Sequence, residues 1–319
     1  MKIVIPDDFP QVITGTKALE HLEATGEVTL YQSLPRDEQE LLERVDGCDV
    51  VVNIRSSVRF PRSVLSHMSR SVKLLSCWGT GVDHVDLDAA RSLGVTVSNT
   101  PAANSDAVAE HSLALMLAVA RKITSLDRAV REHIWHGQRL FQCKSKTLGI
   151  VGTGIIGTKF ARLARALGME VIAWTYNPDP EKALRSGFTY VRDLDELLSK
   201  SDVVSLHLRS SESTRGMFDQ AAFAKMKQGA IFVNTARGDL VDENALRAAL
   251  VSGKLSGAGL DVLEKEPLSA SCPLLDLDNV IITPHTGGNT EEALMAGLML
   301  CAENVSSFAR TGDVLHRVV

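Results

Sequence analysis

The sequence of 319 residues predicts an α/β protein with two domains. Short apolar runs alternate with helical stretches along the whole chain, which is typical of parallel sheets covered by helices on both faces. A glycine-rich turn of the dinucleotide-binding kind begins at Gly152, near the middle of the chain. A full series of strands and helices already precedes this turn. The nucleotide-binding domain is therefore expected to be inserted between the start and the end of the other domain.

The first hundred residues carry β-rich apolar runs, which predict strands at residues 2–5, 28–31, 49–53, 73–77 and 95–98. Between these strands, helical patterns predict helices that include residues 15–24, 37–42 and 61–67. A long helical stretch then runs over residues 106–131 and is a candidate to connect the two domains.

A second alternating series predicts strands at residues 147–151, 170–174, 203–208, 230–234, 257–262 and 280–283. The helices expected between them cover residues 155–167, 193–199, 220–226 and 243–252. A last helix over residues 291–309 is expected to return to the first domain. The predicted domains are thus residues 1–99 with 288–319, and residues 100–287.

Composition excludes several classes of function. The net charge of −5 comes without any basic block, so nothing favours a nucleic-acid partner. The longest apolar stretch, residues 113–120, falls far short of the ~20 residues that span a bilayer. The N-terminus has no signal-peptide pattern, and five scattered cysteines without a C-x-x-C pair indicate a reducing, cytoplasmic location. No spacing typical of metal ligands is present.

The glycine-rich turn follows an apolar strand and opens a helix, the context that gives this motif its meaning. Gly152 permits a tight turn, Gly154 lets the backbone approach a pyrophosphate, and Gly157 allows close packing of the helix on the strand. The helix start at Ile155 and Ile156 offers free N–H groups and a positive dipole end to the phosphates.

The residue that reads the adenosine ribose is expected at the end of the next strand, where Asp or Glu selects NAD. Thr175, followed by Tyr176, occupies this place, so the choice between NAD and NADP stays open. Asp179 is either a second ribose-binding candidate or an exposed turn residue between two prolines. Arg209 is either a partner for a 2′-phosphate or a solvated arginine.

Three late segments, residues 234–238, 260–267 and 283–288, each lie where an apolar run meets a loop. They contribute a fixed cation, Arg237, a carboxylate, Glu266, and a titratable proton carrier, His285. Guanidinium groups bind carboxylate and carbonyl oxygens together, and imidazole exchanges a proton near neutral pH. Beside a nucleotide site, this set suggests hydride transfer to a carbonyl.

Together these motifs, with Gly79-Thr80-Gly81-Val82-Asp83-His84-Val85-Asp86 and Val108-Ala109-Glu110, resemble the D-isomer-specific 2-hydroxyacid dehydrogenases over essentially the whole chain. This family includes phosphoglycerate dehydrogenases and glyoxylate/hydroxypyruvate reductases. The resemblance implies two doubly wound parallel-sheet domains, a flavodoxin-like substrate domain with an inserted Rossmann domain, and an active site in the cleft between them. It also implies NAD or NADP as cofactor and a small 2-keto or 2-hydroxy acid as substrate.

By this resemblance Arg237 orients the substrate, and His285 is the acid–base, with Glu266 stabilising its charged form. Asp261 is expected to bind the nicotinamide carboxamide. Further cofactor contacts are expected from His207, Thr235, Ala236, Arg237, His285, Gly287 and Gly288. Substrate contacts are expected from Arg55, Gly79, Thr80, Gly81, Arg237 and His285. For Gly79–Gly81, a plain tight turn remains the alternative.

Two other functions fit the same residues. One is a corepressor-like scaffold that binds the cofactor without significant turnover, and the other is a Rossmann oxidoreductase of different chemistry. The sequence does not fix the substrate. The resemblance implies a homodimer, for which the helix over residues 106–131 is the candidate interface.

Overall fold

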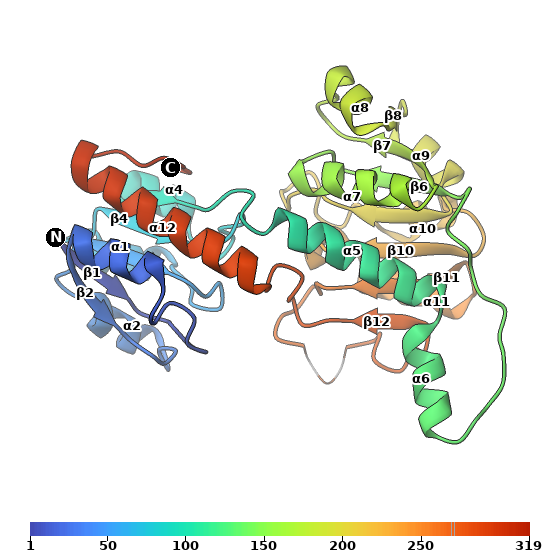
Figure 1. Ribbon diagram of the computed structural model, residues 1–319, viewed down its shortest axis with the longest axis horizontal. Coiled ribbons are helices and arrows are strands. Elements are labelled where there is room, and N and C mark those ends of the chain that lie inside the picture. Colours follow the sequence, from blue (N-terminus) through green and yellow to red (C-terminus); the bar gives the residue numbers. More distant parts are fainter. Residues whose placement is uncertain (269, 271) are drawn as a thin grey trace. The chain divides into compact units, whose positions relative to one another are not determined.

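The computed structural model describes residues 1–268, 270 and 272–319, which form two compact units (Figure 1). Unit 1 consists of Met1–Asn104 together with Asn289–Val319, and unit 2 of Ser105–Gly288. The chain thus leaves unit 1, builds unit 2 and returns. The assignment of substrate binding to residues 1–99 with 288–319, and of nucleotide binding to residues 100–287, stays a prediction.

Unit 1 contains a five-stranded, fully parallel sheet in the order β2-β1-β3-β4-β5. This is the flavodoxin-like strand order, which confirms the predicted fold class for this unit. Its strands are β1 (Lys2–Ile5), β2 (Glu27–Leu30), β3 (Val50–Asn53), β4 (Leu74–Cys77) and β5 (Thr96–Ser98).

Helices cover both faces of this sheet because alternate strand residues point to opposite sides. Ile3 and Ile5 belong to the core under α1 (Lys17–Thr25) and α12 (Glu291–Thr311). Val4 and Val51 belong to the core on the other face. That face is covered by α2 (Glu38–Val45), α3 (Arg62–Met68) and α4 (Leu87–Leu93).

Unit 2 contains a seven-stranded parallel sheet in the order β12-β11-β10-β9-β6-β7-β8. Counted from β6, the order is that of a Rossmann fold with one further strand, as predicted. The strands are β6 (Thr147–Val151), β7 (Glu170–Trp174), β8 (Thr189–Tyr190), β9 (Val203–Leu206), β10 (Ala230–Asn234), β11 (Leu255–Leu260) and β12 (Val280–Ile282).

The helices of unit 2 lie on both faces of its sheet (Figure 1). They are α5 (Ser105–Ala120), α6 (Ile123–Arg131), α7 (Ile155–Ala166), α8 (Pro180–Ser186), α9 (Leu194–Lys200), α10 (Gln220–Lys225) and α11 (Glu243–Val251), with a short 3-10 turn, η1 (Gly238–Leu240). Glycines in β11 let α5 approach closely. A Cβ atom on Gly259 would lie 2.9 Å from Cβ of Leu115, and one on Gly257 would lie 2.7 Å from Cγ1 of Val119.

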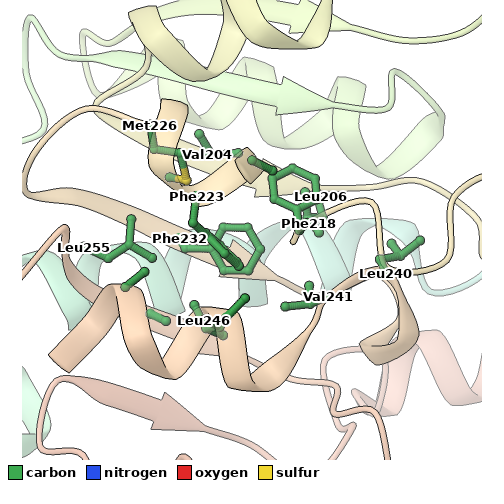
Figure 2. Close-up of a cluster of buried hydrophobic side chains, with 14 of the residues drawn as sticks. Val204, Leu206, Phe218, Phe223, Met226, Phe232, Leu240, Val241, Leu246 and Leu255 are labelled. Carbon is green, nitrogen blue, oxygen red and sulfur yellow. The ribbon is translucent and has the colours of Figure 1, made fainter. Parts of the chain in front are cut away.

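One face of this sheet is filled by a cluster of three phenylalanines (Figure 2). The ring centroid of Phe232, on β10, lies 5.3 Å from those of both Phe218 and Phe223. Leu246 of α11 completes the cluster. Such tilted and edge-to-face aromatic packing anchors α10 and α11 against the sheet and holds the end of β10 in place.

The helix predicted over residues 106–131 is two helices, which corrects the sequence-based expectation. α5 ends at Ala120, whose carbonyl accepts a hydrogen bond from the N–H group of Phe141. Lys122 then adopts a left-handed conformation with φ of 50° before α6 begins. The apolar stripe of α5 is buried, whereas α6 has no buried residue, so the core ends where the chain turns.

The sequence-based prediction did not include α4 and α8, two helices of seven residues each. Both begin at an aspartate that accepts a hydrogen bond from the N–H group three residues later, Asp86 for α4 and Asp179 for α8. Within the described part of the chain, no helix combines the length and apolarity needed to cross a membrane.

Candidate active site

His285 and Glu266 form a hydrogen-bonded pair in unit 2. Nδ1 of His285 lies 2.7 Å from Oε2 of Glu266. An ionised carboxylate only accepts hydrogen bonds, so this contact assigns the proton to Nδ1 of the imidazole. Nε2 is then the ring nitrogen that can exchange a proton. The two side chains are 46% and 38% exposed, so the pair is open to a ligand.

Glu266 is held by its own loop as well as by the histidine. Its Oε1 atom accepts a hydrogen bond from the N–H group of Leu263 at 3.0 Å. Burial raises the pKa of Glu266, but the bonds from His285 and Leu263, with the charges of His285 and Arg237, bring it below its ordinary value. Glu266 is therefore a stable anion at neutral pH.

Arg237 lies in the turn that follows β10. Asn234 shapes this turn, because its amide nitrogen donates to the carbonyl of Arg237 and its amide oxygen accepts from the N–H group of Ala236. One guanidinium nitrogen of Arg237 donates to the Ala236 carbonyl at 2.6 Å. The hydroxyl of Thr235 lies 2.8 Å from that of Ser112 on α5. The cation is thus presented by a turn with a fixed backbone.

The Arg237 turn and the Glu266 loop are in direct contact. A Cβ atom added to Gly238 would lie 1.9 Å from the carbonyl carbon of Leu263, which no real Cβ atom tolerates. Gly238 is therefore required for the loop to pass over the turn. This close approach brings the guanidinium and the carboxylate to the same place, which agrees with the effect of Arg237 on the pKa of Glu266.

Asp261 holds the loop that carries His285. Its buried carboxylate accepts hydrogen bonds from the Thr283 hydroxyl at 2.6 Å, the Thr286 N–H group at 2.9 Å and the Gly287 N–H group at 2.8 Å. Its carbonyl accepts from the N–H group of His285. Burial raises the pKa of Asp261, but these bonds and one from His111 bring it below its usual range. The left-handed backbone of His285, with φ of 53°, is fixed by these contacts.

His111, on α5, is a member of this site that the sequence reasoning did not single out. Its Nε2 atom lies 2.9 Å from the Thr283 hydroxyl and 3.4 Å from Oδ1 of Asp261. The Thr283 proton is donated to Asp261, so Thr283 accepts from Nε2–H of His111. The feature of the sequence that could have pointed to His111 as a site residue is its position directly after the Val108-Ala109-Glu110 motif.

The glycine-rich turn lies at the carboxyl end of β6, beside β9, where the strand order of the sheet reverses. Gly152 has φ of 103°, and a Cβ atom there would lie 2.7 Å from the carbonyl of His207. A Cβ atom on Gly157 would lie 2.2 Å from the carbonyl oxygen of Gly152, whereas one on Gly154 would meet nothing within 4 Å. Gly154 begins α7 without a side-chain cap. These features fit a dinucleotide pyrophosphate held by the first N–H groups of α7.

A family model described as the D-isomer specific 2-hydroxyacid dehydrogenase, NAD binding domain, matches residues 113–287. The chain belongs to the D-isomer specific 2-hydroxyacid dehydrogenase family. This confirms the resemblance inferred from the motifs.

The chain is similar to characterised proteins along its whole length. D-3-phosphoglycerate dehydrogenase from Archaeoglobus fulgidus is 37% identical over 321 residues, covering 100% of this chain and 59% of the relative. Hydroxypyruvate reductase from Thermotoga maritima is 40% identical over 279 residues, covering 86% of this chain and 87% of the relative. A glyoxylate reductase crystal structure from Paecilomyes thermophila is 34% identical, with a TM-score of 0.89 and coverage of 100% and 98%. The chain thus spans 59% of the Archaeoglobus protein and most of the other two.

In this D-isomer specific 2-hydroxyacid dehydrogenase family member, the end of β7 carries Thr175 and an exposed Tyr176, whose ring packs against Trp174. Asp179 is the N-cap of α8, and its Oδ1 atom accepts a hydrogen bond from the N–H group of Lys182 at 3.1 Å. Its part in ribose binding stays a prediction. Nζ of Lys182 donates to the carbonyl of Thr153 in the glycine-rich turn at 3.3 Å. Arg209 is exposed to solvent.

His207, predicted to contact the cofactor, has its ring directed into the protein. Its Nε2 atom lies 3.0 Å from the Ser205 hydroxyl, and its ring centroid lies 5.6 Å from that of Phe160. Burial lowers the pKa of His207 to about 3, so the ring is neutral. The backbone of His207, rather than its ring, faces Gly152 of the turn.

The remaining residues predicted to bind substrate belong to unit 1. Gly79, with φ of 104°, follows β4, and its N–H group donates to the Thr100 hydroxyl at 2.7 Å. The N–H group of Gly79 is therefore already paired within the protein. Arg55 follows β3, and one of its guanidinium nitrogens donates to the Pro10 carbonyl.

Proposed function

We propose that this chain is an NAD(P)-dependent D-2-hydroxyacid dehydrogenase that acts on the C2 carbonyl of a small 2-keto acid. The single observation that best supports this activity is the grouping of Arg237, Glu266 and His285 in unit 2. A fixed cation, an ionised carboxylate and a proton-exchanging nitrogen come from three separate loops. Two of these loops touch at Gly238, and the His285–Glu266 hydrogen bond joins the third.

In this proposal the guanidinium of Arg237 binds two groups of the substrate, its carboxylate and the neighbouring carbonyl oxygen. A planar guanidinium matches two such oxygens and stays charged at every physiological pH. The rigid turn made by Asn234 reduces the entropy that is lost when the guanidinium is held in one orientation. The guanidinium of Arg237 also stabilises the negative charge that develops on the carbonyl oxygen during reduction.

His285 is proposed to donate the proton to that oxygen, and to remove it in the opposite direction. When bound, the reduced nicotinamide supplies the hydride. The bond from Nδ1 to Glu266 leaves Nε2 to carry the exchanged proton, and the carboxylate stabilises the imidazolium form. Asp261, Thr283 and His111 hold the loop on which this imidazole lies.

The cofactor contacts stay a proposal for each residue. The turn Gly152–Gly157 would hold the pyrophosphate, with Ile155 and Ile156 at the start of α7. Thr175 and Tyr176 would border the ribose, and Thr235, Ala236, Asp261, Gly287 and Gly288 the nicotinamide end. Thr175 has no carboxylate that would repel a 2′-phosphate. The end of β7 is therefore compatible with both NAD and NADP.

In unit 1, Thr80 and Gly81 are proposed to bind the substrate carboxylate through backbone N–H groups. Arg55 is proposed to contact a distal substrate group. These contacts rest on the family resemblance and on the position of both segments after strands of the same parallel sheet.

A screen of cofactor and substrate pairs tests the proposal directly. NADH and NADPH would each be mixed with glyoxylate, hydroxypyruvate, pyruvate and phenylpyruvate, and loss of the reduced cofactor followed by absorbance. Turnover of at least one 2-keto acid that is abolished in Arg237→Ala supports the assignment. Cofactor binding without turnover of any 2-keto acid would instead support a corepressor-like scaffold or a different Rossmann oxidoreductase. The relatives named above are dehydrogenases and reductases, which gives no support to the scaffold.

A homodimer and a cytoplasmic location complete the proposal. The segment that includes α6 and the chain after it exposes Ile123, Val130, Ile134 and Trp135, the last at 88%. Several exposed apolar side chains on one segment support the proposal of a protein interface there. All five cysteines are free thiols, in agreement with a reducing compartment. Light scattering on wild type and on Trp135→Ser would test the dimer.

A further inference from the structure

A buried carboxylate lies where a ligand would be expected in unit 1. In the strand order β2-β1-β3-β4-β5, the chain reverses direction across the sheet between β1 and β3. Crevices at such reversals, outside the carboxyl ends of the strands, commonly bind ligands. Here Asp7, two residues after β1, fills this position and is fully buried.

The Asp7 carboxylate binds the segment that follows β3. It accepts hydrogen bonds from the N–H groups of Ile54 at 3.0 Å and Arg55 at 2.8 Å, and from the side-chain amide of Asn53 at 2.5 Å. Three N–H donors favour the ionised form of this carboxylate. Asp7 thus positions the backbone from which the Arg55 side chain emerges.

The same contacts fix the orientation of the Asn53 amide. Its nitrogen donates to Asp7 and to the Arg55 carbonyl, so its oxygen must face His84, whose Nε2 atom lies 2.7 Å away. That oxygen is an acceptor, and Nε2 of His84 therefore carries a proton. A chain of hydrogen bonds runs from Asp7 through Asn53 to His84, and all three side chains are buried.

This chain connects two loops after neighbouring strands. Asn53 ends β3 at the start of the Arg55 segment, and His84 belongs to the loop that begins with Gly79–Gly81 after β4. We propose that Asp7, Asn53 and His84 form a positioning network that holds these two loops in the arrangement that binds the 2-keto acid, so that substrate affinity depends on the ionisation of Asp7. The inference rests on the proposed function, because it takes both loops to contact substrate.

Burial raises the pKa of Asp7 to about 6, against the opposing effect of its bonds to Ile54, Arg55 and Asn53 and of the Arg55 charge. Protonation would place a hydroxyl among three N–H donors and break at least one bond. The other groups facing Asp7 are the thiols of Cys77 on β4 and Cys301 on α12. Burial raises the pKa of both thiols, that of Cys301 to about 12, so they stay neutral while Asp7 titrates.

The test compares Asp7→Asn with a matched control, Asp8→Asn. Asp8 is the next residue and equally buried, but it accepts from the N–H groups of Val12 and Ile13 and has no contact with Asn53. KM and kcat for glyoxylate and hydroxypyruvate would be measured between pH 5 and 8, along with the dissociation constant of the reduced cofactor. In Asp7→Asn we expect KM to rise by about ten-fold or more, with kcat and cofactor binding little changed. Asp8→Asn should leave KM close to wild type.

In wild type, KM should rise as pH falls through about 6, as ionised Asp7 is lost. In Asp7→Asn that rise should be absent. Equal effects of Asp7→Asn and Asp8→Asn on KM, or a wild-type KM that is constant over this range, would overturn the inference.

A readout independent of turnover separates the network from the proposed activity. In wild type, the nitrogen-15 and proton shifts of the His84 Nε2–H group should change as pH falls through about 6, because protonation of Asp7 weakens its bond to Asn53. In Asp7→Asn that change should be absent, whereas Asp8→Asn should keep it. A His84 signal that responds to pH identically in wild type and in Asp7→Asn overturns the network even in an active enzyme. A protein that reduces no 2-keto acid but shows the Asp7-dependent change would refute the proposed function and leave the network standing.

Discussion

Nδ1 of His285 and Oε2 of Glu266 lie 2.7 Å apart, although the two residues are separated by nineteen positions and come from different loops. The contact depends on Asp261, which fixes the His285 loop, and on Leu263, which holds the other oxygen of Glu266. The proposed acid–base group is therefore oriented before any ligand arrives, a property that favours fast proton transfer.

Replacing Glu266 by glutamine should lower kcat for keto-acid reduction by about ten-fold or more. The neutral amide removes the anion that accepts the Nδ1 proton of His285, so the orientation of the ring and the charge of its protonated form are less well stabilised. Initial rates at saturating substrate measure the effect, and Glu264→Gln, a change in the same loop, is the control. A kcat close to that of wild type would contradict the pairing.

Loss of the Arg237 side chain should depress keto-acid reduction by about 100-fold or more in kcat/KM, because a charge-assisted, two-pronged contact to substrate disappears. Arg237→Lys should recover only part of this loss, since an ammonium cannot bind both oxygens in the same plane. Arg215→Ala, which removes an exposed arginine of the same unit, is the control. Near-normal turnover by Arg237→Ala would contradict the proposed role of Arg237 in binding the substrate.

Gly238→Ala should disturb the site without touching a charged group. Its Cβ would lie 1.9 Å from the Leu263 carbonyl carbon, so the Glu266 loop must move. We expect a loss of about 1–3 kcal/mol in the free energy of unfolding, from overpacking, together with reduced kcat. Gly137→Ala, where a Cβ meets nothing within 4 Å, should leave both quantities unchanged. Denaturant unfolding gives the change in stability, and rate measurements give the change in kcat. A Gly238→Ala variant with the stability and activity of wild type would show that the Glu266 loop can move without cost, and would contradict this account.

Asp261→Asn should lower stability in a pH-dependent way. The pKa of Asp261 is lower in the folded protein than in the unfolded chain, so its contribution is complete above the unfolded value of about 4. That contribution is lost as pH falls through the folded value. Wild type should therefore exceed Asp261→Asn in unfolding free energy by about 1–3 kcal/mol at pH 7, and the difference should shrink in acid. A difference that stays constant between pH 7 and 3 would contradict this account.

Arg209→Ala tests whether the exposed arginine contributes to cofactor choice. If Arg209 pairs with a 2′-phosphate, kcat/KM should fall by about ten-fold for NADPH and remain constant for NADH. Arg192→Ala, which removes another exposed arginine of unit 2, controls for a general loss of positive charge. An unchanged ratio of the two cofactors would leave Arg209 as a solvated side chain.

Strands and the glycine-rich turn were predictable from the sequence because buried parallel strands are continuous apolar runs. The observed β10 (Ala230–Asn234) and β7 (Glu170–Trp174) agree with the prediction residue for residue. The break at Lys122 was not predictable, since it arises from the end of the core under α5 and from a bond to Phe141, distant in sequence.

The residues of the proposed acid–base pair were predictable from the sequence, but the contacts that hold them in place were not. Arg237, Glu266 and His285 lie at the strand ends indicated by the apolar pattern. Asp261 and His111 hold the loop that carries His285. Their contacts join α5 to the loop after β12, and these segments are far apart in the sequence, so a single sequence does not predict that they meet. The hydrogen bonds that link Asp7 to His84 through Asn53 were not predictable for the same reason.

The last helix has a consequence for synthesis on the ribosome. α12 supplies Leu298, Cys301, Ala302 and Val305 to the core beneath β1 and β3, yet it is translated only after all of unit 2. The part of this sheet face that α1 does not cover must stay exposed while nearly two hundred residues of unit 2 emerge and fold. The nascent N-terminal half is thus the segment most exposed to premature aggregation, and the one for which chaperone binding would matter most.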